Sequence, residues 1–341
     1  MSSSEFGVPS PPRTSNSEPR TLSGILVVDK PVGWTAHDVV ARVRRLTGER
    51  RVGHAGTLDP AATGVLPICV GEATKVVEYL SAHGKVYLAA ILLGTRTDTD
   101  DLDGWVIGEC DHSDISLEVI EAQLSQFTGE ITQIPPAYSA IHIGGQRAYA
   151  LARAGKIVNV PARQVMIHRL ALVAWAAPVA WLVVDCGAGT YIRALARDLG
   201  QALGCGATLA RLIRLRSGPF RLCEAWSLDE LAALPDLHAA WPQVAIHPDA
   251  ALVDWPALLL DDRAARDWSQ GKAIVDSGAW DGTNVRAYDA TGNWHGIGVG
   301  ADGAWRPKKV VRTEGGLRTE WAMQVTSNGE FRRRKKDGEK R

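Results

Sequence analysis

An apolar run and the polar residues after it predict a strand followed by a helix. Residues 25–28, Ile-Leu-Val-Val, are apolar without interruption, which is typical of a short buried strand. Thr35 can cap a helix together with Asp38 three residues later, and Gly48 supplies a helix stop. We therefore expect a buried strand that leads into a capped helix.

Further strands and one long helix are expected in the middle of the chain. Residues 85–93 alternate between two faces, and residues 181–186 predict another strand. Apolar residues then repeat at helical spacing over residues 192–203, with Arg193 and Arg197 on a second face of the helix. Strands and helices are mixed without strict alternation, which favours an α+β fold over a doubly wound sheet.

The C-terminal part of the sequence predicts a separate β-rich unit. Prolines and a break in periodicity indicate a domain boundary within residues 235–250. A helix capped by Asp261 and closed near Gly271 should follow, and then short strands between residues 285 and 310. The expected organisation is a flexible extension at 1–22, a large domain at 23–240, a small β-rich domain at 248–320 and a basic flexible tail at 321–341.

Composition, charge and cysteine content narrow the class of protein. The 341 residues are 45% apolar and 22% charged, as in an ordinary globular chain, and no apolar stretch approaches the roughly 18 residues of a membrane span. The N-terminus does not resemble a secretory signal, so a cytoplasmic location is expected. Five widely separated cysteines without a CxxC pair suggest neither a disulfide framework nor a zinc site. Lysine plus arginine equals aspartate plus glutamate at 38 each, so any nucleic acid must bind a local basic face.

The most informative segment is RVGHAGTLDPAATGVLPICVG, residues 51–71, in which glycines and a proline surround one acidic side chain. Gly53 and Gly56 permit close approach or positive φ, and Pro60 fixes the chain immediately after Asp59. The alternative interpretation is that Asp59 only caps a turn, as Asp-Pro often does. The physical chemistry of the residues alone leaves the two interpretations open.

Several segments resemble the pseudouridine synthases of the bacterial TruB type. GHAGTLDPAATGVL, residues 53–66, is similar to the signature of that family. The other matching segments, in chain order, are GILVVDKPVGWTAHDVV, KVYLAAILLGTRTDTDDLDG, QIPPAYSAIHIGGQRAYALARAG, CGAGTYIRALARDLG and RLIRLRSGPF. The resemblance implies the pseudouridine synthase fold, a mixed, largely antiparallel central sheet flanked by helices. GNWHGIGVGADGAWRPKKVV is similar to a PUA-like RNA-binding module, which would make the small C-terminal domain part of the RNA-binding surface.

The resemblance also implies three catalytic residues. Asp59 resembles the catalytic nucleophile of the family, Arg193 the arginine that pairs with it, and Tyr87 the aromatic residue that stacks on the target base. A guanidinium fork suits a carboxylate better than a point charge does. Conversion of uridine to pseudouridine consumes neither an electron nor water, so no cofactor and no metal are expected. Asp59 could act at C6 of the base or at C1′ of the sugar, and the sequence does not choose between them.

Substrate and substrate-binding residues follow from the same resemblance. The implied substrate is uridine 55 in the T arm of tRNA, which has to be flipped out of the folded RNA. His54 resembles the residue that fills the vacated position, Tyr191 an aromatic beside the carboxylate, and Leu212 a leucine that lines the base pocket. Without the resemblance, structural or packing roles would be the ordinary interpretation of all three. The protein is expected to act as a monomer without guide RNA.

Four rival interpretations of the sequence concern a calcium site, a dinucleotide site, a noncatalytic protein and a guide-dependent enzyme. The acidic segment TDTDDLDG fails the register of a calcium-binding EF-hand, since Asp103 stands where that loop requires glycine. GAGTYI, residues 187–192, lacks the third glycine of a dinucleotide-binding fingerprint. A noncatalytic RNA-binding protein on the same scaffold is disfavoured by retention of Asp59, Tyr87 and Arg193 together. A guide-RNA-dependent synthase shares the catalytic core, but the GVLP wording is closer to the stand-alone type.

Two departures from the family pattern affect expected phosphate contacts. Ile141-His142 stands where a lysine is expected, and Ile213-Arg214 stands where paired arginines are expected. Neither departure touches Asp59.

Overall fold

The computed structural model describes residues 22–138, 142–143, 146–147 and 160–311. Residues 1–21 of the predicted N-terminal extension, the predicted basic tail and Ile141 lie outside these residues. Leu22, the last residue of the predicted extension, is instead buried, and its amide donates to the Glu49 side chain. Among the described helices, none combines the length and apolar character needed to cross a bilayer.

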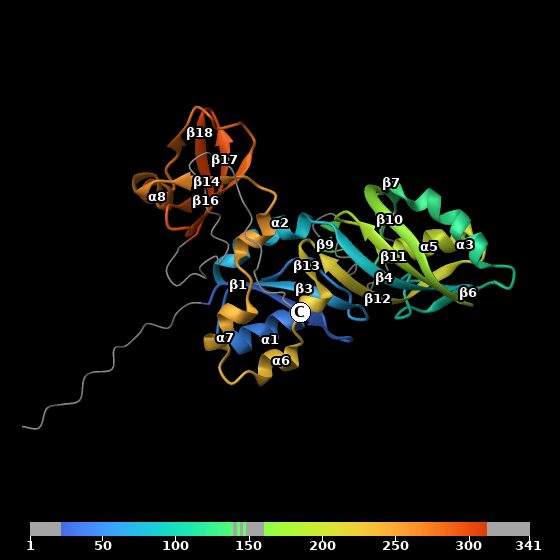
Figure 1. Ribbon diagram of the computed structural model, residues 1–341. Coiled ribbons are helices and arrows are strands. Elements are labelled where there is room, and N and C mark those ends of the chain that lie inside the picture. The colour runs from blue at the N-terminus through green and yellow to red at the C-terminus, as the bar shows by residue number, and fades with distance from the viewer. Residues whose placement is uncertain (1–21, 139–141, 144–145, 148–159, 312–341) are drawn as a thin grey trace, which may run out of the picture.

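A central mixed sheet forms the larger part of the molecule (Figure 1). Its strands run in the order β1-β3-β12-β4-β11-β10-β7, with β2 paired to β3 and β13 paired to β12. All described pairs in this sheet are antiparallel except β12 with β3, as the expected fold class requires. The strands of this sheet are β1 Gly24–Lys30, β2 Val52–His54, β3 Thr63–Val70, β4 Lys85–Leu93, β7 Gly129–Gln133, β10 Arg163–Ala176, β11 Val179–Cys186, β12 Ala207–Ser217 and β13 Phe220–Arg221.

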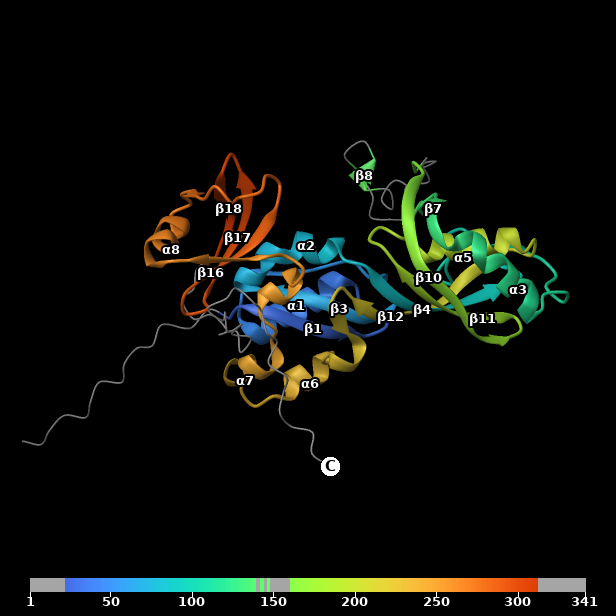
Figure 2. The same cartoon turned by 45° about the horizontal axis from the view of Figure 1, so that its top comes forward.

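Helices cover the sheet in two separate groups (Figures 1 and 2). One apolar core lies under α1 with α6 and α7, and another lies between the sheet, α3 and α5. The helices of the larger unit are α1 Ala36–Thr47, α2 Val77–Ala82, α3 Leu117–Leu124, α5 Ile192–Ala202, α6 Leu228–Ala233 and α7 Leu237–Val244, with 3-10 turns η1 Gly71–Val76, η2 Ser125–Phe127, η3 Leu222–Glu224 and η4 Pro248–Leu252. Two hairpins lie outside the main sheet, β5 Thr95–Thr97 with β6 Val106–Glu109 and β8 His142–Ile143 with β9 Gln146–Arg147.

The predicted helix after the first strand is confirmed together with both of its ends. The Thr35 side chain accepts from the backbone of Asp38, and the Asp38 side chain accepts from the backbone of Thr35. Gly48 ends the helix with φ of 69°, a conformation that glycine adopts without steric cost. This capping fixes the orientation of α1 beside the loop that carries Asp59.

The C-terminal unit is β-rich, as expected, and contains a five-stranded sheet in the order β14-β16-β17-β18-β15. Its elements are β14 Ala257–Leu260, α8 Asp262–Ser269, β15 Ile274–Val275, β16 Asn284–Asp289, β17 Trp294–Ala301 and β18 Ala304–Val310. Asp261 caps α8 as predicted. The buried indole of Trp268 donates a 3.2 Å hydrogen bond to the His295 carbonyl oxygen and so joins α8 to the sheet.

Residues 235–250, where prolines and a break in periodicity indicate a domain boundary, contain a helix that the sequence pattern does not predict. Residues 237–244 form α7, although Pro242 lies inside it. The helix persists because Asp236 caps its first turn and Trp241 is buried against the core under α1. Tertiary packing therefore outweighs the weak local pattern.

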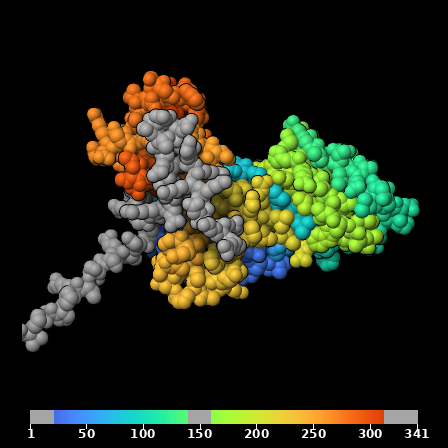
Figure 3. Space-filling model, viewed as in Figure 1, coloured from blue at the N-terminus to red at the C-terminus, as the bar shows by residue number. Residues whose placement is uncertain are grey.

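The C-terminal unit and the lobe of α3, β7 and β10 lie at opposite ends of the larger sheet (Figures 1 and 2). The space-filling view shows a concave outline between them (Figure 3). Lys309 lies 3.1 Å from Glu78, and the Lys308 ammonium lies 5.5 Å from the centre of the Tyr79 ring, so β18 contacts α2 directly.

Candidate active site

Asp59 lies in the loop between β2 and β3, and its backbone surroundings are fixed. The carbonyl oxygen of Pro60 accepts hydrogen bonds from the Gly33 amide at 2.8 Å and from the Lys30 ammonium at 3.2 Å. Gly56 has φ of 93°, which a residue with a side chain adopts only with strain. The Asp59 side chain is 46% exposed, so a rigid loop presents the carboxylate toward solvent.

Arg193 binds this carboxylate directly. Its Nη2 lies 3.0 Å from Asp59 Oδ2, and its Nη1 lies 3.3 Å from Asp101 Oδ2. The same two nitrogens donate to the carbonyl oxygens of Tyr138 at 3.0 Å and Thr99 at 3.1 Å. Arg193 is only 7% exposed although it begins α5, so the second, polar face predicted for this helix is here a buried clamp.

The acidic segment TDTDDLDG is bound to α5 by arginines. Arg197 Nη1 lies 2.9 Å from Asp100 Oδ2, and the Asp100 backbone adopts a left-handed φ of 62°. The Thr99 hydroxyl donates to Asp101 Oδ1 at 2.6 Å and holds the carboxylate that faces Arg193. In the described part of the chain, no three acidic, histidine or cysteine side chains are grouped as a metal site would require. The segment is thus a support for Arg193.

Arg214 supports the Asp59 loop from below. It is 1% exposed, and its guanidinium donates to the carbonyl oxygens of Val65 at 2.6 Å, Gly56 at 3.0 Å and Thr57 at 3.3 Å. Arg214 lies opposite Tyr87 in the pairing of β12 with β4. Burial raises the pKa of Tyr87, while Arg214 beside it acts in the opposite direction, so the tyrosine stays protonated at neutral pH.

Lys30 is a second buried cation at the loop. Its ammonium, fully shielded from solvent, donates to the carbonyl oxygens of Pro31, Trp34 and Pro60. Burial lowers the pKa of Lys30 to about 8, although Asp59 opposes the effect. Burial likewise lowers the pKa of Lys85 to about 8. Positively charged side chains therefore surround Asp59, whose carboxylate is the candidate for catalysis.

His54 lies at the end of β2 and contacts the start of α1. Its ring centre lies 5.4 Å from that of His37, with the two rings nearly perpendicular. Its Nδ1 is buried and has no hydrogen-bond partner among the described residues. Burial lowers the pKa of His54, and His37 and Arg214 lower it further, so the imidazole is neutral at pH 7.

Tyr191 and Leu212 lie on elements that border the site. The backbone amide and carbonyl of Tyr191, immediately before α5, are both bound by the Gln133 side chain, at 3.0 and 3.3 Å. The Arg163 guanidinium lies 5.6 Å from the centre of the Tyr191 ring. Leu212 is half-buried on β12 and packs against the core that contains Tyr87.

Four supporting residues were not identified from the sequence, namely Lys30, Asp100, Asp101 and Arg214. Lysine and arginine are seldom fully buried, so sequence pattern alone gives no reason to expect them beneath a loop. The acidic run was noticed, but only its contact with Arg193 explains its spacing. The matched segments that contain these residues were the one available signal.

Comparisons with known proteins show which family this chain resembles. Residues 44–192 match the TruB family pseudouridylate synthase N-terminal domain, residues 193–241 the tRNA pseudouridylate synthase B C-terminal domain, and residues 256–311 the pseudouridine synthase II TruB C-terminal domain. The tRNA pseudouridine synthase B of Synechococcus elongatus is 47% identical over 84% of this chain and 98% of its own length. The protein of that name from Pseudomonas aeruginosa is 41% identical over 86% of this chain and 97% of its own length.

Solved structures show the same fold. A Cbf5-Nop10-Gar1 complex contains a chain that is 25% identical, with a TM-score of 0.65 over 86% of this chain and 85% of that chain. A chain of an H/ACA RNP bound to a substrate RNA containing 2′-deoxyuridine is 24% identical, with a TM-score of 0.64 over 85% of each chain.

The structure combines a mixed sheet with a carboxylate and a guanidinium paired at the loop after β2, and the family models match the same chain. The chain belongs to the TruB family of pseudouridylate synthases and is an isomerase. The relatives support the conversion of uridine to pseudouridine in tRNA as its reaction.

Proposed function

We propose that this enzyme isomerises uridine 55 in the T arm of tRNA, with Asp59 as the nucleophile and a flipped-out base as its target. The observation that carries the proposal is the 3.0 Å ion pair between Asp59 and the buried Arg193. The pair orients a carboxylate in a position that remains open to solvent. The relatives named tRNA pseudouridine synthase B support tRNA as the RNA class.

The proposed reaction balances within the nucleotide. Asp59 bonds transiently to C6 of the base or to C1′ of the sugar while the N1–C1′ bond breaks. The freed base turns, C5 bonds to C1′, and the carboxylate departs. C5 then loses its proton and N1 gains one, so no redox cofactor and no metal ion is required. Arg193 stays charged throughout and holds Asp59 against the reacting atoms.

Four further residues are proposed to act around the extruded nucleotide. Tyr87 supplies a ring for stacking on the base, and Leu212, which packs against the core that contains Tyr87, is proposed to border the base pocket. His54, neutral and incompletely hydrogen-bonded, is proposed to enter the space that the uridine leaves. Tyr191 is proposed to border the carboxylate, since Gln133 fixes its backbone at the start of α5.

The enzyme is proposed to act as a monomer in the cytoplasm without guide RNA. Support comes from the relatives, which are 41–47% identical over nearly their whole length, whereas the matching chains of the H/ACA RNP and Cbf5 complexes are 24–25% identical. The proposed domains are residues 23–240 for catalysis and residues 248–320 as a PUA-like RNA-binding unit. The contacts of β18 with α2 support a fixed position of the second unit on the first.

The test is incubation of purified wild type, Asp59→Asn and Asp103→Asn with unmodified tRNA, followed by site-resolved detection of pseudouridine. Asp103 is an exposed acid of the TDTDDLDG segment and provides the matched control. We expect modification at position 55 by wild type and Asp103→Asn, and RNA binding without turnover by Asp59→Asn. Turnover by Asp59→Asn would contradict the catalytic role, and a requirement for guide proteins would select the guide-dependent class.

A further inference from the structure

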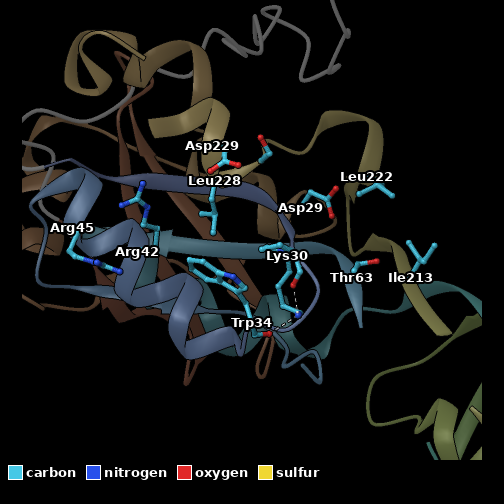
Figure 4. Close-up of a pocket in the computed structure, with 12 residues that line it drawn as sticks. Asp29, Lys30, Trp34, Arg42, Arg45, Thr63, Ile213, Leu222, Leu228 and Asp229 are labelled. Carbon is cyan, nitrogen blue, oxygen red and sulfur yellow. Dashed lines mark hydrogen bonds between the residues drawn. The ribbon is translucent and has the colours of Figure 1, made fainter. Parts of the chain in front are cut away.

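A pocket of about 680 Å³ lies behind the catalytic loop, between α1, the start of α6 and the ends of β1 and β12. Trp34, Arg42, Arg45, Asp29, Asp229 and Ile213 are among its lining residues (Figure 4). The buried Lys30 also lines it, and the Lys30 ammonium binds both the Trp34 carbonyl oxygen and the Pro60 carbonyl oxygen. Lys30 therefore lies between the pocket and the loop that carries Asp59. The other lining side chains differ from those that surround Asp59.

The polar groups of this pocket are divided between its two ends. Arg42 and Arg45 of α1 lie at one end, whereas Asp29 lies at the other (Figure 4). Asp29 Oδ1 accepts a hydrogen bond from the Gly64 amide at 3.1 Å. Within the described residues, the side chains of Arg42 and Asp229 make no hydrogen bond or ion pair, and the Arg45 side chain donates only to a carbonyl oxygen of its own helix. Such side chains are available to a ligand that carries an anionic group at one end and hydrogen-bond donors at the other.

The middle of the pocket is apolar and suits a planar ring. The Trp34 indole lies between the two charged ends, with Leu228 above it (Figure 4). Ile213 adds an apolar side chain at the end near Thr63, at a position where the family pattern leads us to expect an arginine. In this chain position 213 therefore adds no cation to the lining, whose positive groups are Lys30, Arg42 and Arg45.

We propose that this pocket binds a nucleoside monophosphate whose base carries an exocyclic amino group. The base packs on Trp34, its amino group donates to Asp29 or Asp229, and its phosphate pairs with Arg42 and Arg45 (Figure 4). A polyanion without a base would face two carboxylates, and a purely apolar ligand would leave both arginines without a partner. The pocket volume lies within the range usual for small-molecule sites. The nucleotide is either free or part of the bound tRNA.

Calorimetry with the full-length protein tests the site through binding alone, so the result does not depend on the proposed catalytic role of Asp59. We expect AMP to bind with one-to-one stoichiometry. UMP, which lacks the amino group, and adenosine, which lacks the phosphate, should each bind roughly tenfold or more weakly, as expected for loss of a hydrogen bond to a charged group. Equal binding of adenosine and AMP would overturn the role of the arginines.

Three variants separate this pocket from general attraction of phosphate. Arg42→Glu should weaken AMP binding roughly tenfold or more, while Arg50→Glu, the same charge change on an exposed arginine just beyond α1, should not. Ile213→Arg adds positive charge at the end of the pocket near Thr63, away from Trp34 and the two arginines, so AMP binding should not strengthen (Figure 4). Stronger binding by Ile213→Arg, equal effects of Arg42→Glu and Arg50→Glu, or no AMP binding at all would each refute the proposal.

Competition between AMP and unmodified tRNA distinguishes a free nucleotide from a nucleotide of the bound tRNA. If the nucleotide belongs to tRNA, unmodified tRNA displaces AMP from Asp59→Asn protein, and Arg42→Glu lowers the affinity for tRNA. If it is a free nucleotide, AMP stays bound in the tRNA complex, and Arg42→Glu leaves tRNA affinity unchanged. Either result supports the site, provided that AMP binding meets the conditions above.

Discussion

The guanidinium of Arg214 donates a 3.0 Å hydrogen bond to the carbonyl oxygen of Gly56, three residues before Asp59. With its bonds to Thr57 and Val65, Arg214 fixes both sides of the catalytic loop from a position that is 1% exposed. Lysine carries the same charge but lacks the planar fork that reaches three carbonyl oxygens. The loop therefore depends on the shape of this side chain and not only on its charge.

Arg214→Lys is expected to lower kcat by about ten- to a hundredfold, since a buried hydrogen bond to a charged group is worth about 1.5–3 kcal/mol. Single-turnover rates would measure the effect on catalysis, and urea unfolding would measure the effect on the stability of the same protein. Arg216→Lys is the matched control, because Arg216 lies on the same strand, is 40% exposed and pairs with Asp185 at 3.1 Å. Full single-turnover activity of Arg214→Lys would show that Asp59 is positioned without it.

Asp101→Asn tests the support of Arg193. Asp101 Oδ2 lies 3.3 Å from Arg193 Nη1, and its loss leaves Asp59 as the only carboxylate described within ion-pair distance of that guanidinium. We expect a drop of about tenfold or more in kcat with nearly unchanged affinity for tRNA, because the change affects orientation at the reacting atoms. Asp103→Asn in the same turn should retain activity. A change confined to KM would instead assign Asp101 to substrate binding.

His54→Gln is expected to reduce the sensitivity of the protein to acid. The pKa of His54 is lowered in the folded state, mainly by burial, so below pH about 6.5 the unfolded chain takes up a proton that the folded chain does not. This group therefore favours folding above its unfolded pKa, and the contribution is lost as the pH falls toward the folded pKa. The wild type should lose up to about 1.4 kcal/mol more per pH unit than the variant in that window.

Urea unfolding at pH 7.5, 6.5 and 5.5 would measure this difference. His168→Gln is the control, since His168 is exposed on β10. Parallel stability curves for wild type and His54→Gln would mean that His54 titrates normally in the folded protein.

Gly298→Ala is expected to destabilise the C-terminal unit. A Cβ atom at this position would lie 2.3 Å from the Trp268 ring, and Trp268 is completely buried. Overpacking of this kind costs about 1–3 kcal/mol, so thermal unfolding should begin at a lower temperature. Gly278→Ala provides the control, because its closest neighbour is an Asp276 side-chain atom at 3.3 Å. An unchanged melting curve would show that α8 shifts to make room.

Elements with strong local signals were predictable from the sequence. Thr35 and Asp38 mark the start of α1 and Gly48 its end, and each of these signals acts within a few residues. Residues 237–244 were missed as a helix because Trp241 packs against residues far away in the sequence. Local patterns record capping and periodicity, but they do not record which distant surface a weak segment will meet.

The candidate site likewise contains residues that the sequence indicates and residues whose roles depend on distant contacts. Asp59 and Arg193 were identified by resemblance, and the structure brings them into contact at 3.0 Å. The support from Lys30 and Arg214 was missed, since a cation that binds carbonyl oxygens has no partner whose identity the sequence reveals. Ile213 stands out as a departure from the family pattern, but only the structure shows that it lines the same pocket as Trp34.

The groups that hold Asp59 come from segments that are synthesised long after it. A nascent chain that has already exposed β3 possesses the carboxylate, but the guanidinium of Arg193 and the clamp of Arg214 are supplied only when α5 and β12 have been made and packed. Emergence of Asp59 from the ribosome is thus separated from assembly of the contacts around it. The full set of contacts that hold Asp59 can form only after β12 has been made, so the ordered loop reports assembly of the larger sheet.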